Sequence, residues 1–482
     1  MKLSTLVEKI NTLDVYADLD MDISGVSYDT RTICSGDLFV AIRGLKHDGH
    51  KYIEEAVKKG AVCVICEEPP AVDAQYILVE NSRKALALSS AAWFGNPAEK
   101  IKIIGATGTN GKTTVTTLIK HVLEQCTKGK IGLIGTNGNW IGDKEYLTSH
   151  TTPESFEIQK LLAMMVDEGC EYAVMEVSSH ALVLDRVHGI TFEVGIFTNL
   201  SPEHLDFHKS MEEYAKAKSL LFSISRNSAI NIDDEYAQVM IDNALGSIFT
   251  YSIKKEKADL VGKNIHLRPN KVEFCALTIG NLSRVELKIP GLFSVYNALA
   301  TMSAALLAGF DLEIITAAIE TCKSAKGRVE IVPTDTDYTV LIDYSHTPDA
   351  LLNVISMARE STKGRVVTLF GCGGDRDKSK RAVMGQIAAK YSDFVVVTSD
   401  NPRTEDPIEI ISQILVGMAD TKTPYEVIVS RREAIHWALD NTKTDDVLIL
   451  AGKGHETYQI VGTEKNHFDE REIVAEFFEV RG

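Results

Sequence analysis

The chain has 482 residues, which is too long for one hydrophobic core and indicates about three domains. Its 44% hydrophobic and 24% charged residues are typical of a globular protein, and no run approaches the roughly 18 apolar residues of a membrane span. The formal net charge of -16 argues against a nucleic-acid partner, because such a protein needs a basic face to replace the counterions around phosphates.

The first 98 residues form a block in which predicted strands and helices alternate. We expect strands over GDLFVAIRG, AVCVICEE and YILVEN, and helices over KYIEEAVKKG and SRKALALSSAAWFG. The dipeptide Asn96-Pro97 marks the end of the block. The N-terminal sequence MKLSTLVEKINTL does not resemble a signal peptide, so we expect a cytoplasmic protein.

The chain's eight cysteines are scattered, and its single C-x-x-C, formed by Cys63 and Cys66, lies in one of these predicted strands. A zinc site needs a second ligand pair at the usual spacing, which the sequence does not offer. We therefore expect core residues with free thiols in a reducing compartment.

The second block, residues 99–330, opens with IKIIGATGTNGKTT at positions 101–114. A short apolar strand runs into a glycine loop that ends in Lys112 and Thr113, and the helical sequence VTTLIKHVLEQC follows. Backbone N–H groups and the helix dipole converge in such a loop, and a lysine and a hydroxyl complete a nucleotide-Mg²⁺ site. Strand, loop and helix together favour nucleotide binding over an ordinary strand-to-helix turn.

The glycine pattern of this loop is a variant. The strict Walker pattern has glycine six residues before the lysine, where this chain has Ala106. The glycines present are Gly105, Gly108 and Gly111. Further strands are expected over YAVMEVSS, FEVGIFTNLS and SAINIDDE, followed by a β-rich stretch to Lys288 and a helix within PGLFSVYNALATMSAALLAG.

The third block, residues 331–482, repeats the alternation. Its predicted strands are YTVLIDYSH, RVVTLFGCGG, DFVVVTSDNP and DVLILAGKGHE, each ending in a small or polar loop before a helix. Strands that alternate with helices indicate an α/β protein with mainly parallel sheets. Ligands of such sheets bind beyond the carboxyl ends of the strands, where this sequence concentrates Asp, His, Gly and Arg.

The glycine loop at residues 108–114 is called the phosphate loop below. A metal would have two candidate ligands close to it. Glu176 ends the strand YAVMEVSSH, and a carboxylate there can reach a Mg²⁺ ion on the nucleotide. His204 follows the next predicted strand, with Asp206 and His208 nearby. From chemistry alone His204 is more often a polar loop residue. The H-x-D-x-H spacing could also suggest zinc, but the adjacent nucleotide loop argues against it.

Lys218 lies in EEYAKAKSLLFS, which we interpret as a helix. Residues three and four positions away share its face, and these are Tyr214, Ala215, Leu221 and Phe222, all apolar or aromatic. Desolvation favours a neutral amine on such a face, and a neutral amine can take up CO₂ to form a metal-binding carbamate. The alternative, favoured by the pattern alone, is a lysine that extends along the stripe to water.

The sequence resembles the Mur ligase family over essentially its whole length. The matching motifs occur in the family's order: GATGTNGKTT, HTTPES, MEVSSHAL, TNLSPEHLDFH, YAKAKSLLF, GLFSVYN, GRVE, DYSHTPDAL, GCGGDRDKSKR, DNPR and AGKGHETYQ. The resemblance implies a three-domain α/β architecture. An N-terminal UDP-sugar domain (1–98) precedes a central P-loop ATPase-like domain with a mainly parallel sheet (99–330) and a mobile, Rossmann-like amino-acid domain (331–482).

The resemblance also implies the reaction. ATP would phosphorylate the D-glutamate carboxylate of UDP-N-acetylmuramoyl-L-Ala-D-Glu, and the amine of meso-diaminopimelate would displace phosphate through a tetrahedral intermediate. This is a step of cytoplasmic peptidoglycan precursor synthesis, and we expect a monomer. The D-N-P-R form of the loop at 400–403 resembles diaminopimelate-adding members, since a guanidinium can grip the second carboxylate that L-lysine lacks.

The resemblance assigns roles at the nucleotide residue by residue. The ATP-binding residues are Gly108, Thr109, Asn110, Gly111, Lys112, Thr113 and Thr114, with Asn297 for adenine and Asp343 for ribose. Thr113, Glu176 and His204 would serve one Mg²⁺, and Lys218, as a carbamate, a second. Lys112, Lys218, Glu176 and His204 are thus the expected catalytic residues.

It assigns the two other substrates in the same way. The muramoyl-dipeptide residues are Thr30, Thr151, Thr152, Ser178 and Arg186, and the amino-acid residues are Arg376, Asp400, Asn401, Pro402, Arg403, Gly452 and Glu456. Thr30 stands where a D-S-R triplet is commoner, and Leu184 where some relatives have a polar contact.

Three other readings stay open at this stage. The chain could be the same ligase with L-lysine as substrate, or a related ligase that adds a dipeptide to the same precursor or glutamate to folate. GCGGDRDKSKR and DNPR argue against the related ligases. A non-catalytic, nucleotide-binding scaffold is the third, against which the presence of Glu176, His204 and Lys218 argues.

Overall fold

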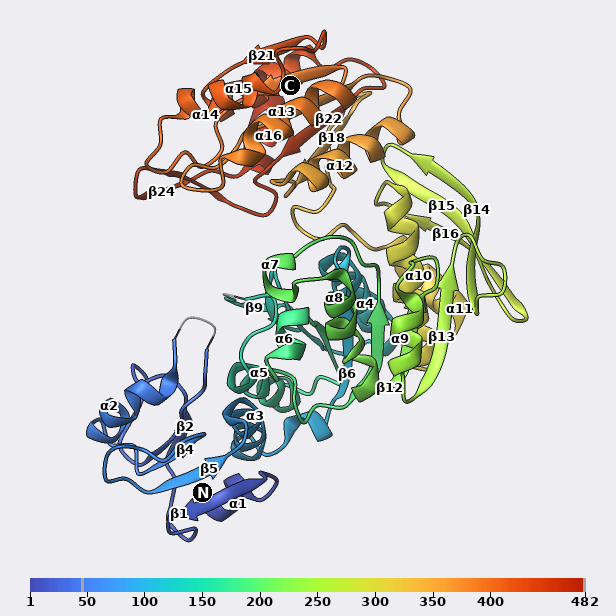
Figure 1. Ribbon diagram of the computed structural model, residues 1–482. Coiled ribbons are helices and arrows are strands. Elements are labelled where there is room, and N and C mark those ends of the chain that lie inside the picture. Colours follow the sequence, from blue (N-terminus) through green and yellow to red (C-terminus); the bar gives the residue numbers. More distant parts are fainter. Residues whose placement is uncertain (45–46, 149, 480–482) are drawn as a thin grey trace. The chain divides into compact units, whose positions relative to one another are not determined.

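The computed structural model describes residues 1–44, 47–148 and 150–479, without the side chain of Asp206. These residues separate into two compact units, which are residues 1–259 with 300–310 and residues 260–299 with 311–482. The fold is α/β with mainly parallel sheets and helices against them, as predicted (Figure 1). No helix of the described residues is long and apolar enough to cross a membrane.

The N-terminal region is built on a sheet of order β1-β5-β4-β3-β2. Its strands are β1 (Thr12–Tyr16), β2 (Gly25–Ser27), β3 (Asp37–Val40), β4 (Cys63–Cys66) and β5 (Tyr76–Val79). Its helices are α1 (Leu3–Val7), η1 (Gly49–Tyr52), α2 (Ile53–Lys58), α3 (Ser82–Trp93) and η2 (Pro97–Glu99). All but β1 run parallel to their neighbours, and β1 pairs antiparallel with β5.

Cys63 and Cys66 lie in β4, where both side chains are buried and free. Burial raises the pKa of the Cys63 thiol to about 12 and that of the Cys66 thiol to about 11, so both stay protonated and unreactive. The prediction of core thiols in a strand is confirmed.

The phosphate loop belongs to a larger sheet, whose strands in the first unit follow the order β13-β12-β11-β6-β10-β7-β8-β9. These strands are β6 (Lys102–Thr107), β7 (Ile131–Gly135), β8 (Gly138–Ile141), β9 (Lys144–Tyr146), β10 (Tyr172–Glu176), β11 (Phe192–Phe197), β12 (Ser225–Asn231) and β13 (Ser247–Ser252). The helices are α4 (Lys112–Thr127), α5 (Ser155–Asp167), α6 (Ser179–Val183), α7 (Leu205–His208), α8 (Met211–Ser219), η3 (Phe222–Ile224) and α9 (Ala237–Asn243). β6 and β10 are almost wholly buried, because helices cover both faces of a parallel sheet.

The same sheet carries an antiparallel meander in the second unit, in the order β16-β15-β14. Its strands are β14 (Leu260–Arg268), β15 (Lys271–Thr278) and β16 (Asn281–Leu287). Helix α10 (Leu292–Leu307) begins in the second unit and ends in the first, and α11 (Leu312–Glu320) packs on β16. Burial alternates along β15, as expected of a strand with one face in water.

The C-terminal region has a sheet of order β17-β18-β22-β19-β20-β21, parallel except for β17. Its strands are β17 (Glu330–Val332), β18 (Thr339–Asp343), β19 (Val366–Phe370), β20 (Phe394–Val397), β21 (Tyr425–Val427) and β22 (Val447–Ala451). The helices are α12 (Pro348–Ser361), α13 (Ser379–Tyr391), α14 (Pro407–Val416), α15 (Arg431–Asn441) and α16 (Glu470–Glu479).

Alternation along these strands divides the core between the two faces of the C-terminal sheet. Leu341 packs with side chains of α12, α13 and α14, whereas Val340 and Ile342 pack with α15 and α16. One expectation fails here. β22 is followed by a hairpin, β23 (Tyr458–Val461) and β24 (Glu464–His467), and only then by a helix, because the Gly462 turn returns the chain with φ +62°.

Candidate functional site

The phosphate loop follows β6 and is flanked by the ends of two neighbouring strands. The register pairs Ala106 with Glu176 of β10 and Thr107 with Phe197 of β11. Gly108 has φ +153°, and a Cβ there would lie 1.9 Å from Thr198 Oγ1. The loop therefore requires glycine at this position and holds its backbone close to β11.

The loop ends at Gly111, which caps helix α4 with φ +88° and supplies no side-chain acceptor. The first-turn amides of α4 thus face the loop without a side-chain cap, which suits an anion. Loop geometry is fixed from β11, since the Asn110 amide donates to Asn199 Oδ1 at 2.9 Å and Thr198 Oγ1 donates to Asn110 O at 2.7 Å.

Gly105 has a different role from the loop glycines. It lies inside β6, where a Cβ would approach Phe192 Cε1 to 2.6 Å, so it serves packing of the strand.

Lys112 folds back over the loop, and its Nζ donates to the carbonyls of Gly108 at 2.8 Å and Thr109 at 2.9 Å.

Glu176 is buried at the end of β10 and faces the start of α4. Its Oε2 accepts hydrogen bonds from Thr113 Oγ1 at 3.0 Å and Thr136 Oγ1 at 3.1 Å, and Oε1 accepts from the Thr136 amide at 2.8 Å. A carboxylate and a hydroxyl at a nucleotide loop are hard oxygen donors of the kind Mg²⁺ prefers. Sequence reasoning missed Thr136, because nothing in the sequence links it to Glu176.

His204 lies outside this oxygen cluster. It has φ +56°, its side chain is 48% exposed, and its ring meets that of His180 edge-on at 5.0 Å. His208 is buried with Nε2 2.8 Å from Ser179 Oγ. Among the described side chains no group of three His, Cys, Asp or Glu residues could hold a metal, and the Asp206 side chain of the H-x-D-x-H sequence lies outside them.

Lys218 is buried on α8, and only 1% of its surface is exposed. The expected apolar face is present, since Tyr214, Ala215, Leu221 and Phe222 are all buried, so the alternative of a lysine that reaches water is wrong. Nζ donates to Gly108 O at 2.8 Å and lies 4.5 Å from the centre of the Tyr214 ring.

The electrostatics at Lys218 favour the neutral amine. Burial, reinforced by the charge of Lys112, lowers the pKa of Lys218 well below its usual value, and Glu203 opposes this more weakly. Lys112 and Lys218 donate to the same carbonyl, that of Gly108. No described carboxylate forms an ion pair with Lys218.

The predicted muramoyl-dipeptide residues of the central region gather beside Glu176. Thr152 Oγ1 donates to Glu176 O at 2.8 Å and accepts from the Ser178 amide at 3.1 Å. Arg186 Nη1 donates to Thr152 O at 2.8 Å, and Thr151 Oγ1 lies 3.0 Å from Thr136 Oγ1. This cluster adjoins the phosphate loop through Glu176.

Thr30 lies apart from that cluster, in the N-terminal region. It lines a cavity of about 600 Å³ together with Tyr28, Asp29, Arg31 and Tyr52. Tyr28 donates to Glu157 of α5 at 2.9 Å, and Arg83 Nη1 lies 3.1 Å from Glu154, which also pairs with Arg186. Polar contacts thus tie this region to the muramoyl cluster.

In the second unit, the predicted amino-acid residues meet at the carboxyl ends of β19, β20 and β22. Arg403 has φ +51°, and its Nη1 donates to Gly374 O at 2.8 Å. Asn401 Nδ2 donates to Glu456 Oε2 at 2.9 Å. A Cβ on Gly452, which has φ +116°, would lie 2.7 Å from Asp400 Oδ2. Arg376 is exposed.

Lys453 is a residue of this site that sequence reasoning missed. It is 0% exposed, and its Nζ lies 3.2 Å from both Asn401 Oδ1 and Glu456 Oε2. Its place between Gly452 and Glu456 in AGKGHE was an available signal. The lysine fixes two side chains of the predicted amino-acid site.

Asn297 and Asp343 also belong to the second unit. Asn297 is buried on α10, and Asp343 ends β18. The Asp343 carboxylate accepts hydrogen bonds from the Val329 amide and from Ser345 Oγ, and burial raises its pKa. A ribose hydroxyl would have to share these oxygens.

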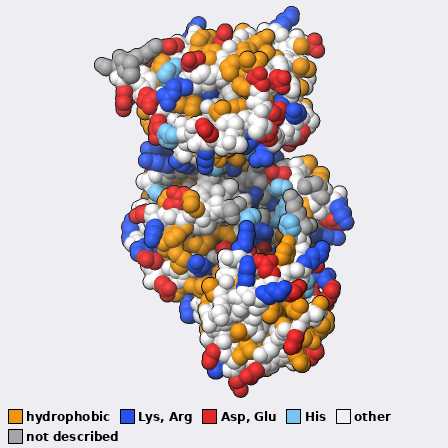
Figure 2. All heavy atoms as spheres, turned by 90° about the vertical axis from the view of Figure 1, so that its left-hand side faces the viewer, with side chains coloured by type: hydrophobic (Ala, Val, Ile, Leu, Met, Phe, Trp, Pro, Cys, Tyr) orange, Lys and Arg blue, Asp and Glu red, His pale blue; other side chains and the backbone are white. Residues whose placement is uncertain are grey.

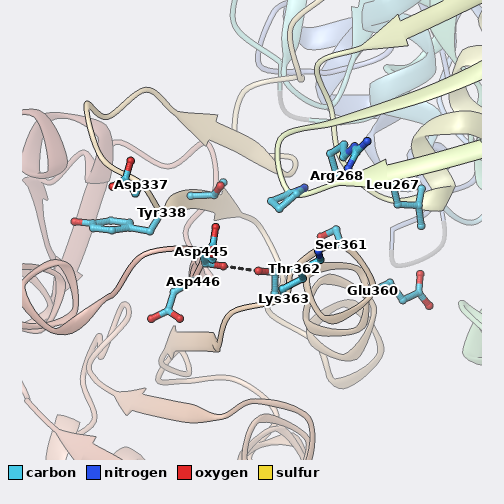
Figure 3. A pocket seen from close by; sticks show the side chains of 12 residues that line it. Leu267, Arg268, Asp337, Tyr338, Glu360, Ser361, Thr362, Lys363, Asp445 and Asp446 are labelled. Carbon is cyan, nitrogen blue, oxygen red and sulfur yellow. Dashed lines mark hydrogen bonds between the residues drawn. The ribbon is translucent and has the colours of Figure 1, made fainter.

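A further cavity lies at the opposite edge of the C-terminal sheet. It has a volume of about 380 Å³ and is lined in part by Asp337, Tyr338, Thr362 and Asp445 (Figure 3). Asp337, Tyr338 and Asp445 precede β18 and β22, and Thr362 follows α12, so the cavity lies away from the predicted site at the carboxyl ends of the strands. On the face shown in Figure 2, Lys and Arg side chains gather locally, although acidic residues outnumber basic ones in the chain.

Comparison with known proteins places this architecture. Three family models match: "Mur ligase family, catalytic domain" over residues 22–102, "Mur ligase middle domain" over 106–305 and "Mur ligase, glutamate ligase domain" over 327–454. A protein of Caldanaerobacter subterraneus subsp. tengcongensis named UDP-N-acetylmuramoyl-L-alanyl-D-glutamate--2,6-diaminopimelate ligase is 50% identical, over 96% of each chain. A protein of Clostridium tetani with the same name is 46% identical over 99% of each.

A solved structure titled with the same ligase name superposes with a TM-score of 0.78 at 30% identity, covering 100% of this chain and 99% of that one. These features define an α/β protein of two compact units, with the phosphate loop in the first and a separate polar site in the second. The family models and the full-length relatives are decisive for the family. The chain belongs to the Mur ligase family.

Proposed function

We propose that this chain is an ATP-dependent ligase that joins an amine of meso-2,6-diaminopimelate to the D-glutamate carboxylate of UDP-N-acetylmuramoyl-L-Ala-D-Glu. The observation that carries the proposal is that relatives with this name are 42–50% identical over 94–100% of this chain. The reaction belongs to peptidoglycan precursor synthesis and would take place in the cytoplasm.

The phosphate loop is the proposed ATP site. The loop from Gly108 to Thr114 would bind phosphates with its amides, and Lys112 would turn from the Gly108 and Thr109 carbonyls to the nucleotide. Thr113 and Glu176 would hold Mg²⁺, which neutralises phosphate charge where the protein as a whole is acidic. His204, whose side chain is 48% exposed, would complete this ligand set in our proposal.

The muramoyl-dipeptide would extend from the Thr30 cavity to the cluster at Glu176. Thr151, Thr152, Ser178 and Arg186 would orient the D-glutamate carboxylate beside the phosphate loop. A carboxylate oxygen then attacks the γ-phosphorus, ADP leaves, and an acyl phosphate forms. The incoming amine attacks the acyl carbon, and the tetrahedral adduct expels phosphate and loses a proton.

Lys218 would contribute as a carbamate. Its amine, kept neutral by burial and by Lys112, would add to CO₂ and lose a proton, which converts the neutral amine into an anion that can bind a second Mg²⁺. The Gly108 carbonyl and the Tyr214 ring fix the amine at the loop.

Arg403 would select the amino acid. A planar guanidinium matches the second carboxylate of diaminopimelate with two parallel hydrogen bonds, and Asp400, Asn401, Glu456 and Gly452 would surround the rest of the molecule. L-Lysine leaves this guanidinium unpaired, so we expect it to be a poor substrate by orders of magnitude.

The test is phosphate release by the purified enzyme with ATP, the muramoyl-dipeptide and a panel of amino acids. We expect release that requires both the dipeptide and diaminopimelate, with at least about a hundredfold preference over L-lysine in kcat/KM. Arg403→Ala should raise KM for diaminopimelate, and Arg432→Ala, at an exposed ion pair on α15, is the control. Equal kcat/KM for both amino acids would overturn the assignment of the amino acid, and absence of any ligation would overturn the ligase.

A further inference from the structure

A completely buried arginine lies behind the predicted amino-acid site. Arg381 on α13 is 0% exposed and forms a bidentate pair with Glu405, with Nη1 to Oε2 at 3.0 Å and Nη2 to Oε1 at 2.9 Å. Nη1 also donates to Gln413 Oε1 at 2.9 Å, and Nη2 to Gly373 O at 3.2 Å. The guanidinium therefore joins a helix to both loops that carry predicted substrate residues.

Glu405 fastens these loops to each other on one side. Its Oε1 accepts from the Asp375 amide at 2.6 Å. The Asp375 carboxylate in turn accepts from the Thr404 amide at 3.2 Å and from Thr404 Oγ1 at 2.8 Å. Arg381 holds Gly373 on the other side of the same loop. Residues 373–375 are thus held to Arg381 at one end and to residues 404–405 at the other.

Gly374, between these two anchors, fixes the guanidinium of Arg403. Its carbonyl accepts from Arg403 Nη1 at 2.8 Å, and its amide donates to Asn401 O at 2.9 Å. The Gly374 backbone packs closely against the Pro402 backbone, because a Cβ on Gly374 would lie 1.8 Å from Pro402 O. A displacement of the 373–375 loop would therefore displace the Arg403 guanidinium.

We infer that Arg381 and Glu405 are positioning residues, which set the place of the Arg403 guanidinium and thereby the preference for an amino acid with a second carboxylate. The inference rests on the proposed function, because it assigns selectivity within that reaction. Neither residue needs to touch substrate. Buried Arg–carboxylate pairs often contribute little net stability, whereas they do impose a defined geometry.

The chain offers a matched control on the same carboxylate. Lys378 Nζ lies 3.1 Å from Glu405 Oε2, but its side chain is 62% exposed. An exposed ion pair of this kind contributes little to stability. Lys378→Met therefore removes a charge near Glu405 and keeps the bidentate Arg381–Glu405 pair.

The experiment compares Arg381→Lys, Glu405→Gln and Lys378→Met with the wild-type enzyme by steady-state kinetics of phosphate release. Arg381→Lys keeps the charge but loses the planar fork, and Glu405→Gln keeps the size but loses the charge. We expect KM for diaminopimelate to rise about tenfold or more and the preference over L-lysine to fall by a similar factor. KM for ATP and for the muramoyl-dipeptide should change less than about twofold, and Lys378→Met should match wild type.

A purely structural role would lower kcat with every substrate and leave the diaminopimelate-to-lysine ratio unchanged, and this result would overturn the inference. If Arg381→Lys does not fold, as checked by thermal unfolding, Glu405→Gln decides the question alone. Failure of the proposed function is distinct, because wild-type enzyme would then release no phosphate with diaminopimelate.

Discussion

Lys218 in the first unit and Lys453 in the second are both fully buried, 1% and 0% exposed, but their surroundings differ. Lys453 lies 3.2 Å from the Glu456 carboxylate and from Asn401 Oδ1, so its charge is balanced by the protein. Lys218 has a carbonyl, an aromatic face and the like charge of Lys112. A buried lysine that is paired with a carboxylate stays charged and fixes the side chains around it. A buried lysine without such a carboxylate is favoured as a neutral amine, which can react.

The largest expected effect comes from Lys112, the cation next to Lys218. In Lys112→Ala, we expect turnover to fall on the order of a thousandfold or more, because a phosphate contact that acts in the transition state is lost. Binding of the UDP-substrate, followed by calorimetry, should persist, since Thr30 and its cavity belong to a separate core. Lys120→Met, farther along α4 and paired with Glu124, serves as the control. Turnover near the wild-type rate would refute the assignment of the phosphate loop.

Lys218→Arg tests whether charge or chemistry matters at that position. A guanidinium keeps a cation but cannot form the carbamate, so we expect activity to fall roughly a hundredfold or more. Lys216→Met, on the exposed side of the same helix, should be close to wild type. Retention of full activity by Lys218→Arg would exclude the carbamate.

Lys453→Met tests the balanced lysine. Loss of the ammonium removes one contact from each of Asn401 and Glu456, and we expect KM for diaminopimelate to rise about tenfold with little change in KM for ATP. Steady-state kinetics with each substrate varied in turn gives this split. Equal effects on ATP and amino acid would show that Lys453 supports the fold in general.

The smallest expected effect is on stability. The pKa of Lys218 is lower in the folded than in the unfolded state, so between these values the unfolded chain binds more protons and the wild type loses stability as pH falls. Lys218→Met removes this loss. We therefore compare the free energy of unfolding of Lys218→Met with that of the wild type in CO₂-depleted buffer. As the pH is lowered from 9 to 7, the variant should gain stability relative to the wild type, by up to about 1.4 kcal/mol per pH unit. A pH-independent difference in urea unfolding would contradict the neutral amine.

The sequence was sufficient wherever the signal is local. Strand, GTNGKT and helix are contiguous, and the apolar face of Lys218 follows from spacings of three and four residues. Short strands without buried alternation were missed, as with β1, whose five residues are all exposed. The antiparallel pair β8–β9 was missed for a similar reason, since its strands have four and three residues.

Contacts between distant residues could not be read from the sequence. Thr136 and Glu176 are 40 positions apart, and Arg381 and Glu405 are 24 apart. Each contact depends on which strands become neighbours in the sheet, which pattern alone does not specify. The domain boundaries and the residue roles at the two sites stay predictions.

The most direct test of a neutral, reactive amine at Lys218 is ¹³C NMR of the enzyme in ¹³C-bicarbonate, with ATP and Mg²⁺ present. We predict a carbamate carbonyl signal in the wild type, in Lys216→Met and in Lys453→Met. Only Lys218→Met should lose the signal, which separates the two buried lysines. A wild-type enzyme without a carbamate signal, or a signal that survives in Lys218→Met, would contradict the account.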